Sequence, residues 1–120
     1  MRIRVLVTVM LASFSSPALA ELRCVEPYAP IVGDGATATK DEIQALKLDV
    51  IAFIVASDLY QDCLLRSLKD PELKADKREK LAQEVTQKIN SNQTEKERVG
   101  ADYNKAAEAY NARVRAEKAQ

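Results

Sequence analysis

The second half of the chain repeats seam positions at alternating spacings of four and three residues. These positions are 85, 89, 92, 96, 99, 103, 106 and 110. After Pro71 the chain has no further proline and a single glycine, Gly100. Heptad spacing of this length predicts one helix over about residues 71–117, starting from Asp70 as N-cap and Pro71 at the first helical position. Such a helix needs another helix against its seam, so we expect an all-α fold.

Two polar residues interrupt this seam, Asn92 and Lys96. They lie in and just after the run Asn-Ser-Asn-Gln at 90–93, and Thr-Glu-Lys-Glu at 94–97 could cap a new helix. A break there would give a three-helix bundle. We expect one long helix, because the heptad spacing continues through the polar residues.

A first helix is predicted over about residues 40–68. Thr39 and Glu42 have the spacing of a capping box. One set of apolar residues, at 43, 46, 50, 53, 54, 60, 64 and 68, follows one helical face. A second set lies on a neighbouring face, so we expect this helix to be buried on two sides, by the second helix and by the preceding segment. The second set is Leu48, Ile51, Val55, Leu59 and Cys63.

The preceding segment, residues 21–38, is predicted to be an extended arm. It contains Pro27 and Pro30, which disfavour helix, and Gly33-Asp34-Gly35, which predicts a turn. We expect its apolar side chains to pack on the helices. They are Val25, Tyr28, Ile31 and Val32.

Residues 1–20 have the pattern of a secretory signal peptide. Arg2 and Arg4 precede a short apolar run at 5–12, and Ala18-Leu19-Ala20 places the cleavage point between Ala20 and Glu21. The run is too short to span a membrane, so we expect no stable membrane insertion after cleavage. The predicted organisation is therefore a signal peptide (1–20), an extended arm (21–38) and a helical hairpin domain (39–120), in a periplasmic or secreted protein.

Cys24 and Cys63 are the two cysteines. In an oxidising compartment they predict one disulfide that closes a loop of about 40 residues. An extended arm of this length can run back along the first helix and bring Cys24 beside Cys63. Intermolecular pairing and a redox role are the alternatives, although no Cys-x-x-Cys motif is present.

The composition excludes several classes of function. The chain has no histidine and three glycines, which argues against histidine-based catalysis, histidine metal sites and glycine-rich phosphate loops. Its 18 basic and 18 acidic residues argue against nucleic-acid binding. The row Asp58, Asp62 and Arg66 indicates a solvated ion-pair row rather than an acid–base pair. We expect no catalytic residue, cofactor or metal ion.

Two Tyr-Asn pairs repeat seven residues apart in the second helix, at Tyr103-Asn104 and Tyr110-Asn111. Packing in the seam is the expected role of this stripe, and binding of a partner is the alternative. The second helix is expected to be much longer than the first. Its excess length, with Tyr103, Tyr110 and Val114, makes a homodimer one expected assembly.

Three short motifs carry a resemblance: Cys24 with Pro27, Pro30 and Gly33; Asp-Leu-Tyr-Gln-Asp-Cys-Leu at 58–64; and the repeated Tyr-Asn. With them the chain resembles an uncharacterised group of small exported bacterial helical proteins. It departs from the group at Ile89-Asn90, where a further Tyr-Asn would stand. The resemblance implies a periplasmic helical protein with one disulfide and implies no activity.

These observations predict an exported, non-enzymatic helical protein that binds an envelope protein or a second copy of itself. The alternative is a periplasmic chaperone-like or stress protein, for which the amphipathic, low-aromatic second helix would supply the client surface.

Overall fold

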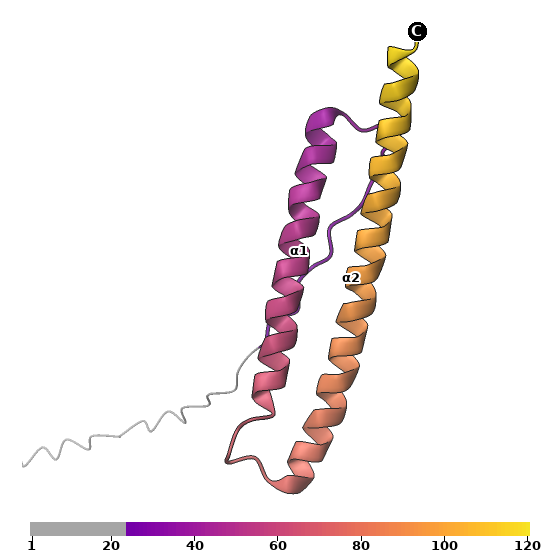
Figure 1. The fold of residues 1–120 in the computed structure, drawn as a ribbon. Coiled ribbons are helices and arrows are strands. Elements are labelled where there is room, and N and C mark those ends of the chain that lie inside the picture. The colour runs from indigo at the N-terminus through magenta and orange to yellow at the C-terminus, as the bar shows by residue number, and fades with distance from the viewer. Residues whose placement is uncertain (1–23) are drawn as a thin grey trace, which may run out of the picture.

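The computed structural model describes residues 24–120, which form a helical hairpin with an extended arm laid along it (Figure 1). Helix α1 is Lys40–Ser67 and helix α2 is Ala75–Lys118. The predicted all-α hairpin with a long second helix is confirmed. Helix α2 continues through residues 90–94, so the three-helix alternative is wrong. The predicted signal peptide (1–20) and its cleavage point lie outside the described residues.

Helix α1 begins at the predicted capping box. The Thr39 hydroxyl accepts a hydrogen bond from the Glu42 N–H at 3.2 Å, and the Glu42 carboxylate accepts one from the Thr39 N–H at 2.7 Å. The predicted turn precedes it. The Asp34 carboxylate accepts from the Ala36 N–H at 2.9 Å, and the Asp34 carbonyl accepts from the Thr37 N–H at 3.3 Å. Local hydrogen bonding therefore fixes where the arm ends and the helix starts.

Helix α2 begins four residues later than predicted. Asp70 is not its N-cap, because the Asp70 carboxylate accepts from the Glu72 N–H at 3.0 Å and closes a turn within the loop. The Arg78 guanidinium then donates to the carbonyls of Asp70 and Leu73, at 3.0 and 3.2 Å. These bonds hold the loop as a separate turn, and the helix starts only after it.

The core between the helices consists of two apolar clusters. The first contains Val50, Phe53 and Val99, and the second contains Tyr60, Leu64 and Val85. The predicted seam is confirmed where it is most buried, at positions 85, 92, 99 and 106. Partly buried side chains complete the two clusters: Ala29, Leu46, Ile54 and Tyr103 at the first, and Cys24, Leu68, Leu81 and Ile89 at the second.

The arm runs back along the hairpin to the predicted disulfide. Cys24 and Cys63 are bonded, with their Cα atoms 5.6 Å apart. Figure 1 shows the arm passing from the lower part of α1 across to α2 and returning to the start of α1. Gly35 lies directly on α2, since a Cβ atom at this position would be 1.7 Å from the Ala106 carbonyl oxygen. The disulfide and this close approach fix the course of the arm.

The expectation that the arm covers a second face of α1 is wrong. Of the second apolar set, Leu48, Ile51, Val55 and Leu59 are exposed, and so are Val25, Tyr28 and Ile31 of the arm. The arm instead follows the groove between the helices, where Ala29 packs on the first cluster and Cys24 on the second. A small side chain and a cysteine fit this groove and Val32 is half-buried, whereas Val25, Tyr28 and Ile31 remain outside.

Candidate interaction surfaces

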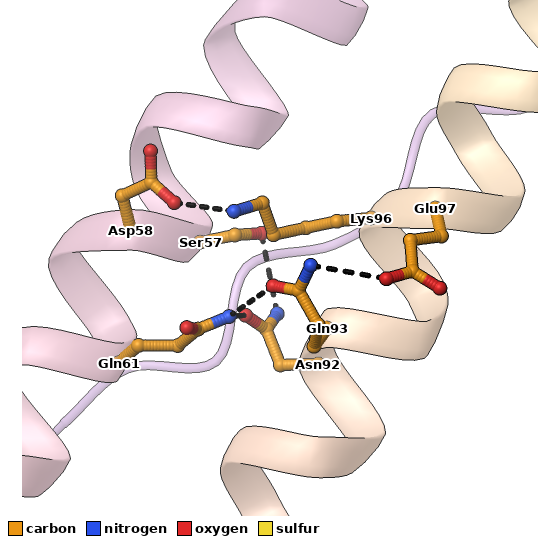
Figure 2. Close-up of polar contacts among 7 residues, drawn as sticks. All are labelled: Ser57, Asp58, Gln61, Asn92, Gln93, Lys96 and Glu97. Atoms are coloured by element: carbon orange, nitrogen blue, oxygen red, sulfur yellow. Dashed lines mark hydrogen bonds and ion pairs between the residues drawn. The ribbon is translucent and has the colours of Figure 1, made fainter.

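A polar layer separates the two apolar clusters at the centre of the hairpin (Figure 2). Asn92 donates from its amide to the Ser57 hydroxyl at 3.2 Å, and its amide oxygen accepts from the Gln61 amide at 2.8 Å. Ser57 is completely buried and Asn92 is 3% exposed. Both buried groups are hydrogen-bonded. The polar run at 90–93, where the sequence allowed a break, therefore remains part of one continuous helix.

The layer continues outward to the solvent on the same side. The Gln61 amide also donates to the Gln93 side-chain oxygen at 3.3 Å, and the Gln93 amide donates to the Glu97 carboxylate at 3.2 Å. Lys96 forms an ion pair with Asp58 across the helices. These residues come from facing turns of α1 and α2 (Figure 2). The layer therefore uses its polar groups to join the helices.

The predicted acidic row on α1 does not form an ion-pair row. Asp58 pairs with Lys96 of the other helix, and within the described residues Asp62 and Arg66 form no ion pair. Residues 24–120 also contain no group of three or more Cys, Asp or Glu side chains that could hold a metal ion. Burial, and secondarily the charge of Glu26, raise the pKa of the Tyr60 phenol. That phenol belongs to the second apolar cluster.

The predicted Tyr-Asn stripe on α2 has some side chains packed within the chain and others exposed to solvent. Tyr103 packs against the first apolar cluster, whereas Asn104 and Asn111 are exposed. Tyr110 is half-buried, and the Arg113 guanidinium lies 5.4 Å from the centre of its ring. The same guanidinium donates to the Ala38 carbonyl just before α1. Much of the stripe therefore serves contacts within the chain, and its role toward a partner stays a prediction.

Beyond Arg113, helix α2 extends past the beginning of α1, as Figure 1 shows at its C-terminal end. Helix α2 has 44 residues and α1 has 28, so α2 is longer by about 24 Å. Part of it lies at the loop end and part at this end. The projecting part ends in basic and small residues, with Arg113 bonded to Glu117 at 2.9 Å.

Two apolar surfaces remain exposed, although the sequence predicts that both pack against another part of the chain. The first is the arm row, Val25, Tyr28 and Ile31, in which Tyr28 is 97% exposed. The second is the α1 outer row, Leu48, Ile51, Val55 and Leu59, in which Leu48 is 68% and Leu59 63% exposed. The sequence contains a signal for the second row, because Leu48, Val55 and Leu59 lie roughly half a helical turn from the core residues Val50 and Ser57.

No helix in the described part of the chain combines the length and the apolar character needed to cross a membrane. Comparison with protein-family models, with curated proteins and with solved structures gives no match to this chain. The structure therefore offers two exposed apolar rows on a disulfide-bonded helical hairpin as its candidate sites.

Proposed function

We propose that this chain is an exported, non-enzymatic protein that acts by binding another protein in the bacterial envelope. The observation that carries the proposal is the exposed arm row. Val25, Tyr28 and Ile31 are spaced three residues apart, are among the most exposed large apolar side chains, and stand on an arm fixed by the disulfide. Exposed apolar side chains on a fixed segment are typical of protein-binding surfaces.

Two further observations support export and binding. A disulfide between Cys24 and Cys63 is stable in an oxidising compartment, which agrees with the signal peptide pattern of residues 1–20. The buried polar groups of the central layer are hydrogen-bonded to one another, and no general base or nucleophile is assembled there. Binding, rather than chemistry, is the activity that this arrangement supports.

The test is photo-crosslinking in the bacterium that makes the protein. A photoreactive amino acid replaces Tyr28 in the arm row, and the control places it at Gln87, on the exposed side of α2. We expect one dominant crosslinked protein from position 28 and none from position 87. Ile31→Lys should reduce that crosslink. Equal labelling from both positions, or no protein captured at position 28, would contradict the proposal.

A chaperone-like function is the second candidate, favoured by the presence of two separate apolar rows on one small protein. It predicts a broad set of unfolded envelope proteins in the same crosslinking experiment. It also predicts that the purified protein slows the aggregation of a denatured client, and that Tyr28→Ser weakens this effect. Fractionation by osmotic shock, with the N-terminus determined by mass, tests export and cleavage before Glu21.

A further inference from the structure

The α1 outer row has charged residues of opposite sign at its two ends. Asp41 and Arg66 lie on the same face of α1 as Leu48 and Leu59, in line with the row. Both are exposed, and neither forms an ion pair within the described residues. From one end to the other, the face therefore presents Asp41, an apolar strip, and Arg66 with Asp62 one turn before it. In the antiparallel register described next, Asp62 lies opposite Ala45 and leaves Arg66 opposite Asp41.

This order is complementary to itself when reversed. A second α1 packed antiparallel on the first, about a two-fold axis at the middle of the row, sets Leu48 opposite Leu59 of the second copy. The same register sets Ala52 opposite Val55 and Asp41 opposite Arg66, and symmetry forms each contact twice. A parallel arrangement would instead set Asp41 against Asp41 and Arg66 against Arg66.

We propose that the α1 outer row is the interface of an antiparallel homodimer, in which a second copy of this chain covers the row. The apolar strip supplies the contact area, and the two Asp41–Arg66 pairs select the antiparallel direction over the parallel one. This inference goes beyond the proposed function, because it assigns α1 to self-association and leaves the arm row for another protein.

The size of the face sets the expected affinity. From Asp41 to Arg66 the helix rises about 37 Å, and a helix is about 10 Å wide. Two such strips bury roughly 700 Å² together, which is less than the ~1,200 Å² of small stable interfaces, so we expect a weak dimer. The measurement must therefore extend to several hundred micromolar.

The first test is sedimentation equilibrium of the chain produced with its own leader and purified after export. We expect a monomer–dimer equilibrium for the wild type. Leu59→Lys should weaken the dimer by at least about 30-fold, because two apolar contacts are lost by symmetry. Ile31→Lys is the matched control, since it makes the same kind of change on the arm row and should leave the dimer intact.

Both substituted side chains are exposed in the monomer, so the fold should survive either change. Melting followed by circular dichroism at low concentration checks this. The pair of variants also separates the two proposals. Leu59→Lys should weaken the dimer and keep the crosslink from position 28. Ile31→Lys should keep the dimer and reduce that crosslink.

The second test fixes the direction of packing. Asp41→Arg and Arg66→Asp each place like charges opposite one another, and each alone should weaken the dimer by roughly three- to tenfold. An equimolar mixture of the two variants should form a heterodimer of restored affinity, because position 41 of each chain then faces an opposite charge at position 66 of the other. Only the antiparallel register combines this recovery with a loss in each variant alone, because a parallel dimer of either variant has the same number of like-charge contacts as the parallel wild type.

Three results would overturn the proposal. A wild type that remains monomeric at several hundred micromolar leaves no dimer to explain. A dimer that is unaffected by Leu59→Lys but lost with Ile31→Lys would place the interface on the arm. A dimer that loses affinity with Leu59→Lys yet gains nothing in the mixed charge variants would not be antiparallel through Asp41 and Arg66.

Discussion

Asn92 of α2 donates a hydrogen bond to the hydroxyl of Ser57 of α1, and both side chains are buried at the centre of the hairpin. This pair lies between the two apolar clusters, so a shift of one helix along the other would bring Asn92 against apolar side chains. A buried amide without a partner is costly. The pair therefore fixes the register of the two helices.

Asn92→Leu should destabilise the protein by about 1–3 kcal/mol, because the Ser57 hydroxyl is left buried without its partner. The double variant Ser57→Ala with Asn92→Leu should recover most of that loss, since an apolar layer needs no partner. Urea unfolding of the wild type, Ser57→Ala, Asn92→Leu and the double variant measures the coupling between the two sites. Additive losses in the double variant would show that the two residues do not act as a pair.

The close approach of Gly35 to α2 gives a sharp contrast between two glycines. Gly35→Ala should destabilise the protein by roughly 1–3 kcal/mol or displace the arm, because the new Cβ would clash with the Ala106 carbonyl. Gly33→Ala is the matched control, since nothing lies within 4 Å of its added Cβ, and it should be neutral or slightly stabilising. Thermal melts of both variants check this. Equal effects would mean that the arm does not rest on α2.

The disulfide should carry a large part of the stability of so small a domain. Removing it in the double variant Cys24→Ser with Cys63→Ser should cost roughly 4 kcal/mol, because the unfolded chain regains the freedom of a loop of about 40 residues. Chemical unfolding under oxidising conditions measures this. A reducing agent should lower the melting temperature of the wild type and leave the double variant unchanged. A double variant as stable as the wild type would show that packing alone holds the arm.

The capping box predicts acid sensitivity at the start of α1. Hydrogen bonds from the Thr39 backbone N–H and side chain lower the pKa of the Glu42 carboxyl below its usual value of 4.5. Its stabilising effect is therefore present above that pH and is lost as the pH falls through the folded-state pKa. The difference in melting temperature between wild type and Glu42→Ala should shrink below about pH 4.5. Glu72→Ala, in the loop, is the control and should show little difference at any pH.

The same acid range affects α2. A hydrogen bond from Arg98 lowers the pKa of the Glu95 carboxyl, and the Asp102 carboxylate accepts from the same guanidinium. Part of any acid unfolding therefore belongs to this exposed cluster. For the Glu42 prediction, the contradicting result is a difference in melting temperature between wild type and Glu42→Ala that stays unchanged down to pH 3. It would show that the carboxylate of Glu42 is not the stabilising form.

Linear patterns in the sequence account for the helices and for the seam between them. Heptad spacing predicted both the length of α2 and its buried positions, because a long helix can bury only the residues that recur on one face. The capping box predicted the start of α1, and the two cysteines predicted the disulfide. Local geometry or a single possible pairing determines each of these features, so the order of residues along the chain is enough to predict it.

The path of the arm and the uncovered face of α1 depend instead on packing between distant segments. Residues 21–38 contain several apolar side chains and no periodic helix pattern, so their sequence indicates no preference between the face of α1 and the groove. The contact of Gly35 with Ala106 and the bond from Arg113 to Ala38 select the groove, through residues more than 70 positions apart. The continuity of α2 through Asn92 arises in the same way, from Ser57 and Gln61 across the hairpin. Such contacts form only between helices that are already packed, and the exposed α1 outer row is their consequence.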